Sequence, residues 1–278
     1  MDWLIEPFEL AAQQRALLAG CLAAIALAVV GTWVVIRGMT FLGDALAHGI
    51  IPGVALALLV DFSLILGAAA AALVMIGGIH LVHRQTAFPE DTGIGLLFVG
   101  MLAVGVMLAS RVEAGSEHLE ELLFGDALDV TGGDIALIVI VLAVTLLLAW
   151  AFHRPLLALA FNEQKAEVLG LRPRLAHGVL LGLLTLTIVG SFQTVGTLLV
   201  FGLLIGPPVT AALLVRRVPV MMAVAALIGV GSVGVGLVAG HHAGVSASAA
   251  MAVAPIVLFF SVLGLRSITG GARAAAGS

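Results

Sequence analysis

The stretch LLAGCLAAIALAVVGTWVVI, residues 17–36, contains no charged side chain. A membrane-spanning helix needs about 20 mainly apolar residues, which is the length of this stretch. The same character extends over the whole chain of 278 residues, which is 62% hydrophobic and 10% charged, with a mean hydropathy of +1.22. Because soluble domains are about 45–50% apolar and about 25% charged, the composition excludes an ordinary soluble enzyme, a nucleic-acid-binding protein and a disordered chain. We predict an all-α, polytopic membrane helical bundle.

Nine segments of the chain are apolar and long enough for membrane helices. They are Leu17–Ile36, Met39–Val60, Ser63–Val82, Ile94–Ser110, Asp134–Phe152, Leu175–Gly190, Val195–Val215, Pro219–Ala239 and Ala247–Leu265. Eight is the alternative count, with the last two segments or the Pro-containing one partly re-entrant. The sixth segment is short, Gln193 lies just before the seventh, and Pro207–Pro208 interrupt the seventh. The transmembrane domain is therefore predicted over residues 17–265, between an outer N-terminal segment 1–16 and a flexible cytoplasmic tail 266–278.

The distribution of basic residues predicts the orientation. With nine spans and the N-terminus outside, ten of the 12 Lys and Arg residues face the cytoplasm, and only Arg15 and Arg111 face outward. The reversed orientation reverses that ratio. We therefore expect the N-terminus outside and the C-terminus in the cytoplasm, with residues 154–174 as the longest basic loop on the inner side.

Glycines recur at four-residue spacing within the apolar segments. The pairs are Gly49 and Gly53, Gly202 and Gly206, and Gly236 and Gly240. Small residues at this spacing let membrane helices approach closely, so we interpret these pairs as packing faces.

Apart from Asp44 and His48, the predicted spans hold almost no ionisable residue, and Asp61 and Asp134 lie at span ends. The four-residue spacing of Asp44 and His48 places both side chains on one face of a helix. If the helix begins near Met39, His48 lies about 14 Å along it, near the bilayer centre. A carboxylate and an imidazole together suit a divalent transition metal. The alternative is structural: Asp44 caps a helix and His48 bonds a neighbouring helix. We favour a role in a metal pathway, since an ionised Asp at this depth costs about 3 kcal/mol and should face a cavity or a partner.

The inner loop contains the polar stretch FNEQKAEVLGLRP, residues 161–173. We expect a short helix over Glu163–Leu169, ended by Gly170, with Pro173 preventing continuation. Such a helix on the cytoplasmic side is well placed to contact a partner protein, and a solvated connector is an equal alternative.

Gly206, Pro207 and Pro208 are expected to break the seventh apolar segment. Broken helices at membrane depth occur where they are buried or line a cavity, so the break is either a static kink or a mobile part of a gate.

The outer loop 113–129 is acidic and includes Glu117, His118, Glu120 and Glu121, while His241 and His242 lie in a second outer loop. These residues are candidates for contact with a cation or an outer partner, although a solvated amphipathic helix is the favoured interpretation of the acidic run.

No nucleophile set, paired-carboxylate site, zinc motif or glycine-rich nucleotide loop appears in the chain. We therefore expect a transport subunit without enzymatic activity and without a resident cofactor, and any ATP-driven step requires a separate chain.

Three motifs in this order resemble the zinc/manganese/iron permease family of ABC importers. They are GDALAH (43–48) with PGVAL (52–56), the loop FNEQKAEVLGL (161–171), and VGTLLV (195–200) with LLIGPPVTAA (203–212). The likeness runs from about Ala16 to Leu265.

The resemblance implies a fold of the vitamin-B12-importer type and a homodimer or heterodimer of permeases in the bacterial inner membrane, with the homodimer favoured. A cytoplasmic ABC ATPase dimer and an extracytoplasmic metal-binding protein are implied as well. It also implies that Asp44 and His48 lie on the metal path. The residues implied to contact the ATPase are Asn162, Glu163, Ala166, Glu167 and Gly170.

The function expected from this resemblance is import of a divalent transition metal, with zinc first and then manganese or iron. The alternative is a stand-alone secondary metal transporter or channel. That alternative needs energy-coupling groups of its own, and the predicted spans hold almost no ionisable residue besides Asp44 and His48.

Overall fold

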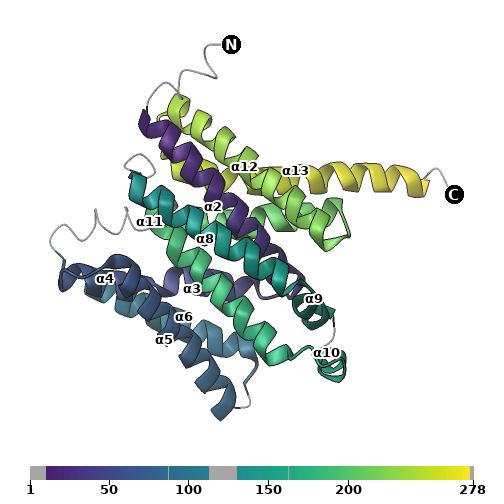
Figure 1. The fold of residues 1–278 in the computed structure, drawn as a ribbon. Helices are drawn as coiled ribbons and strands as arrows, with labels where there is room; N and C mark the ends of the chain where they lie inside the picture. Colours follow the sequence, from purple (N-terminus) through teal and green to yellow (C-terminus); the bar gives the residue numbers. More distant parts are fainter. Residues whose placement is uncertain (1–10, 87, 113–129, 162, 276–278) are drawn as a thin grey trace.

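The computed structural model describes residues 11–86, 88–112, 130–161 and 163–275, and every regular element in those ranges is an α-helix (Figure 1). In chain order the helices are α2 (Ala11–Ile36), α3 (Thr40–Gly49), α4 (Ile51–Leu59), α5 (Leu64–Gln85), α6 (Glu90–Ala109), α8 (Gly132–Ala151), α9 (His153–Phe161), α10 (Glu163–Val168), α11 (Pro173–Leu214), α12 (Val218–Ala243) and α13 (Ala247–Ala275).

Eight helices in the described ranges are long and apolar enough to cross a membrane, with α3 and α4 counted as one. A helix satisfies its backbone N–H and C=O groups within the segment, which is the requirement for lying in hydrocarbon. The predicted fold class, a polytopic helical bundle, is confirmed.

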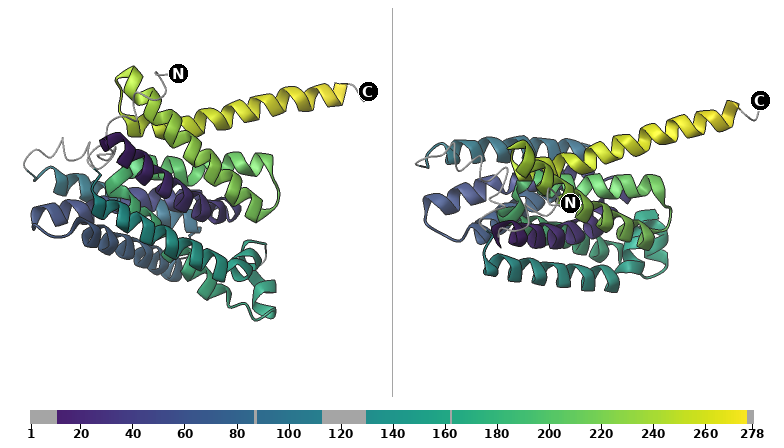
Figure 2. Two further views of the ribbon diagram at one scale, coloured as in Figure 1. Left: turned by 45° about the horizontal axis from the view of Figure 1, so that its top comes forward. Right: turned by 90° about the horizontal axis from the view of Figure 1, so that it is seen from above.

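The centre of the bundle is α2, with α8, α11 and α12 packed around it (Figures 1 and 2). Ala19, Ala23 and Leu27 on α2 are fully buried. Small residues allow this close approach, because Gly20 faces Val233 of α12 with no room for a larger side chain. The core of the protein therefore surrounds the first apolar segment of the sequence.

Although α11 is 42 residues long, it folds back at Gly196. Gly196 has φ 75° and ψ 158°, a conformation that is open to glycine and strained for other residues. Both ends of α11 reach the same end of α2: Ala176 shares a buried cluster with Trp33, and Ala211 shares one with Ala28. A straight helix would separate Ala176 from Ala211 by about 50 Å.

The sixth and seventh predicted segments are therefore the two arms of α11. With α11 counted as two arms, the described residues contain the nine apolar segments delimited in the sequence. The number that cross the bilayer, and the side that each terminus faces, stay predictions.

Two boundaries differ from those expected. The predicted segment Met39–Val60 is divided between α3 and α4, because the helix is interrupted at Ile50 just before Pro52. Helix α13 continues through Ala275, so the boundary expected at residue 266 does not coincide with the end of a helix.

The glycine pairs do mark packing faces. Each of the six glycines faces an atom of another helix that a methyl group would crowd: Gly49 faces Met75, Gly53 faces Gly67, Gly202 faces Ala252, Gly206 faces Pro255, Gly236 faces Met251 and Gly240 faces Ala247.

Candidate functional site

Asp44 and His48 form a contact within α3. The Nδ1 atom of His48 lies 3.2 Å from Oδ1 of Asp44 and also 3.2 Å from the Asp44 backbone oxygen. Both side chains are partly buried, with 16% of His48 and 27% of Asp44 exposed. The predicted common face is confirmed. The capping interpretation of Asp44 is wrong, because α3 begins at Thr40 and Asp44 lies inside the helix.

The aromatic side chain of Phe98 on α6 packs against the imidazole of His48. The ring of Phe98 meets that of His48 edge to face, with 5.9 Å between centroids, and the ring of Phe41 on α3 also packs edge to face on Phe98, at 6.1 Å. Edge-to-face pairs of this kind contribute about 0.5–1.5 kcal/mol beyond their buried area. Sequence reasoning missed Phe41 and Phe98, because an aromatic residue in an apolar run carries no signal of its neighbour.

The helix break lies at Ile50, two residues beyond His48. Pro52 has no N–H to donate to the His48 carbonyl group, so the helical hydrogen-bond pattern fails there. The backbone restarts with Gly53 and Val54, whose N–H groups both donate to the Ile50 oxygen at 3.0 and 3.1 Å. His48 is therefore positioned at the end of α3, one turn after Asp44 and directly before the break between α3 and α4.

Two ligands do not complete a metal coordination shell. Within the part of the chain that the structure describes, no group of three or more His, Cys, Asp or Glu side chains comes together. Manganese and iron sites take up to six donors from oxygen and nitrogen. Any metal held by Asp44 and His48 thus needs donors from water, from the backbone or from a second chain.

The inner loop folds as predicted into the short helix α10. Gly170, with φ 70°, ends it through two hydrogen bonds: Gly170 N–H donates to the Glu167 oxygen at 2.9 Å, and Leu171 N–H donates to the Ala166 oxygen at 3.0 Å. This is the Schellman arrangement that favours glycine. Ala166 is buried and Glu167 exposed, while Asn162 lies outside the described residues and Glu163 is described only through its backbone.

Three exposed apolar residues lie at the ends of this helix or just beyond them. Phe161, Val168 and Leu169 are 76%, 88% and 70% exposed, respectively. We call these three residues the loop knob. The sequence analysis predicted a partner contact through the polar residues of this loop and missed these three apolar ones. Large apolar side chains so exposed at the end of a bundle are typical of a contact surface for another protein.

Gly206, Pro207 and Pro208 lie inside the second arm of α11, where the helix continues through them. The expected break at this point is wrong, and the break lies at Gly196 instead. The missing N–H of Pro208 frees the carbonyl group of Leu204, and that oxygen lies against Gly31 of α2, where even a methyl group would collide with it. The close approach of α2 stabilises the helix here, while a role in a gate stays a prediction.

The outer candidates are only partly described. Glu117, His118, Glu120 and Glu121 lie outside the described residues. His241 and His242 lie at the end of α12, with ring centroids 5.2 Å apart and edge to face. Nδ1 of His241 lies 3.1 Å from Nε2 of the buried Gln13, so His241 is tied to α2.

The sequence of the chain matches the ABC 3 transport family over residues 9–266. The chain belongs to this family. Relatives in it include a "Probable iron transport system membrane protein" of Haemophilus influenzae, 31% identical over 96% of this chain and 98% of the relative. The "Manganese transport system membrane protein MntC" of Listeria monocytogenes is 32% identical over 89% of this chain and 88% of the relative.

Solved structures agree with the ABC 3 assignment. PsaBC from Streptococcus pneumoniae, solved in complex with Fab, superposes with a TM-score of 0.85 and 30% identity over 93% of this chain and 94% of that chain. A metal-chelate type ABC transporter in an inward-facing conformation shares the fold alone, with a TM-score of 0.73 and 15% identity over 90% of this chain and 85% of that chain. The ABC 3 chain described here is thus a multi-pass membrane permease.

Proposed function

We propose that this permease is the membrane subunit of an ABC importer for a divalent transition metal, and that Asp44 and His48 contact the metal on its way through. The observation that carries this proposal is the 3.2 Å contact between the two side chains inside a membrane-spanning helix. Ionisable residues at such depth are rare and mark substrate pathways. More than two thirds of each side chain is buried, which limits the access of water that would compete with these groups for the metal. The exposed remainder of each side chain stays accessible to the metal.

We propose manganese or ferrous iron ahead of zinc as the substrate. The sequence analysis placed zinc first, and the relatives named above support the other two metals through their names. The chemistry supports the same order. In a homodimer, two copies of the pair would supply two carboxylates and two imidazoles, and water would complete the six-fold shell that manganese prefers.

Three partners follow from the proposal. The chain has no nucleotide-binding motif, so ATP hydrolysis belongs to a separate ABC ATPase dimer, for which α10 and the loop knob are the docking surface on this chain. An extracytoplasmic metal-binding protein supplies the metal, and a second copy of the permease completes the pathway. The location that fits this assembly is the bacterial inner membrane. The stand-alone transporter lacks support, since the ABC 3 family match covers residues 9–266.

The test is uptake of radiolabelled manganese by cells that carry the complete transporter, with unlabelled manganese, iron or zinc as competitors. Asp44→Asn and His48→Gln should abolish uptake while the permease stays in the membrane at normal abundance. Asp91→Asn is the matched control, because Asp91 is an exposed carboxylate at the start of α6. Normal uptake by both pathway variants would refute the proposed role of the pair, and competition by zinc alone would refute the order of metals.

A second arm separates the importer from a stand-alone transporter. The permease reconstituted alone in vesicles should move no metal down a gradient. Transport under that condition, without an ATPase, would contradict the importer assignment.

A further inference from the structure

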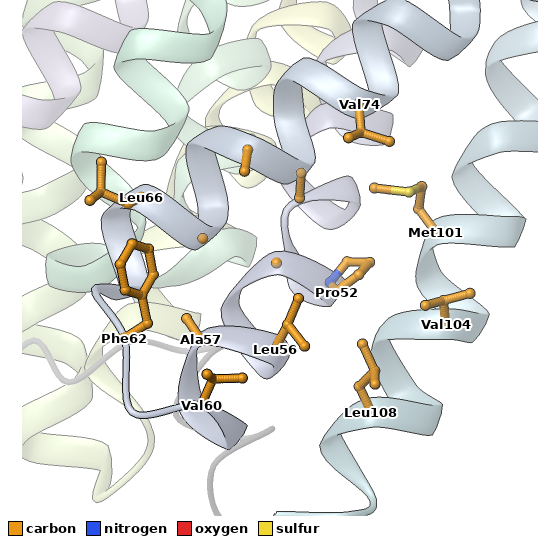
Figure 3. A pocket seen from close by; sticks show the side chains of 14 residues that line it. Pro52, Leu56, Ala57, Val60, Phe62, Leu66, Val74, Met101, Val104 and Leu108 are labelled. Carbon is orange, nitrogen blue, oxygen red and sulfur yellow. The ribbon is translucent and has the colours of Figure 1, made fainter.

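An apolar pocket of about 460 Å³ lies between α4, α5 and α6 (Figure 3). None of its 14 lining residues has a charged or hydrogen-bonding side chain. Figure 3 shows Leu56 and Pro52 on α4 facing Met101, Val104 and Leu108 of α6, with Leu66 and Val74 of α5 at either end. Its volume falls within the range of about 300–1,000 Å³ that is common for small-molecule sites.

The pocket opens toward the surface of the bundle that membrane hydrocarbon surrounds. Its three helices belong to candidate spanning segments, and the lining residues Leu56, Leu66 and Val74 are 51%, 55% and 64% exposed. From Leu66 to Val74 the pocket extends about 12 Å along α5. A cavity with this lining offers water no polar partners, so the occupant must be hydrocarbon at this depth.

Close helix contacts keep the pocket open. Gly53 of α4 and Gly67 of α5 touch backbone to backbone, and Gly105 of α6 packs on Ile51 and Pro52. These contacts hold α4 against both neighbours at the inner end of the pocket, while the longer side chains beyond them hold the helices apart. The pocket is therefore a formed cleft between three fixed helices.

Two charged residues of opposite sign flank the end of the pocket. Asp61 is exposed and lies between the lining residues Val60 and Phe62. Arg111 is exposed and follows Leu108 by one turn. The backbone N–H of Arg111 donates to the backbone oxygen of Leu108 at 3.0 Å. A guanidinium group binds phosphate through charge-assisted hydrogen bonds, and a carboxylate binds ammonium.

We propose that this pocket binds one acyl chain of a zwitterionic phospholipid, with the phosphate at Arg111 and the ammonium group at Asp61. The acyl chain lies between α4 and α6 and ends near Pro52, four residues after His48. Such a lipid fixes the angle of α4 behind the helix break. The inference goes beyond the proposed transport function and its test does not depend on transport.

The test uses the full-length protein in nanodiscs that contain phosphatidylethanolamine with a photoactivatable acyl chain. Peptides from α4, α5 and α6 should be labelled more than other lipid-facing peptides. Val74→Trp should displace about two methylene groups of the bound acyl chain and reduce this labelling by roughly tenfold. Leu73→Trp is the matched control, because Leu73 is 66% exposed on the same helix and does not line the pocket; it should leave the labelling unchanged.

A second comparison tests the head group. Phosphatidylglycerol with the same photoactivatable chain lacks the ammonium group and should label the pocket less, and Asp61→Asn should remove the difference between the two lipids. Equal labelling of the wild type and Val74→Trp would overturn the pocket, and stronger labelling by phosphatidylglycerol would overturn the head-group assignment. A disulfide-linked dimer formed by Leu56→Cys in a Cys21→Ala background would show that a second protomer fills the cleft and would likewise overturn the proposal.

Discussion

Replacing Gly31 with alanine should destabilise the protein, although alanine is the better helix former. Gly31 lies in α2 against the second arm of α11. A β-carbon at this position would collide with the backbone oxygen of Leu204 and would lie 3.0 Å from Cγ of Pro208. Neither atom can move as a flexible side chain does, so the two helices must separate.

The size of the effect follows from two opposing contributions. Alanine favours a helix over glycine by about 1 kcal/mol. Overpacking a filled interior costs about 1–3 kcal/mol, and a rigid backbone neighbour puts Gly31→Ala in the upper half of that range. The net loss in the free energy of unfolding is therefore roughly 1–2 kcal/mol, which corresponds to a decrease in Tm of roughly 2–8 °C for a chain of this size.

The assay is thermal unfolding of the purified permease in one fixed detergent. Gly182→Ala is the control, since Gly182 is also helical and has no atom within 4 Å of an added β-carbon. It should leave Tm unchanged or raise it, through a gain of up to about 1 kcal/mol. Pro208→Ala restores an N–H for the Leu204 oxygen and removes the nearby ring, so Gly31→Ala should cost less in that background. Equal Tm values for Gly31→Ala and Gly182→Ala would refute the contact.

Three further changes follow from the same reasoning. Gly196→Ala should lower Tm, because a side chain at φ 75° and ψ 158° costs about 1–3 kcal/mol; an unchanged Tm would contradict the fold-back of α11. Pro52→Ala should raise Tm by making α3 and α4 continuous while lowering manganese uptake; higher Tm with normal uptake would show that the break is only structural. Val168→Asp together with Leu169→Asp should leave Tm of the isolated permease unchanged, since both side chains are exposed, and should reduce co-purification of the ATPase; a normal complex on a sizing column would count against the loop knob.

Much of the fold could be predicted, because bilayer thickness sets the length of a spanning helix and composition then reveals it. The four-residue glycine pairs, such as Gly202 and Gly206, also predicted real packing faces. The fold-back at Gly196 was not predicted. Proline signals a helix break by its missing N–H, whereas one glycine among the 34 in the chain carries no comparable mark.

The candidate site shows a similar division. The Asp44–His48 contact was predicted, since it depends only on helical spacing within one segment. Phe98 of α6 could not be predicted, because its contact with His48 depends on how two helices pack. The same limit applies to the pocket, whose 14 lining residues come from α4, α5, α6 and the turn between α4 and α5.

Two glycines lie against proline-containing segments of other helices. A carbonyl group freed by proline cannot turn to water inside a bilayer, so a neighbouring helix must approach it. The Leu204 oxygen, freed by Pro208, lies against Gly31, and Gly105 packs on the backbone of Pro52. Gly31 faces a carbonyl oxygen that Pro208 frees, whereas Gly105 lies against the nitrogen of Pro52, and neither glycine belongs to a four-residue pair. The outcome differs between the two sites. Helix α11 stays helical through Pro207 and Pro208, where α2 packs on the freed oxygen, while the helix before Pro52 ends at Gly49 and restarts at Ile51.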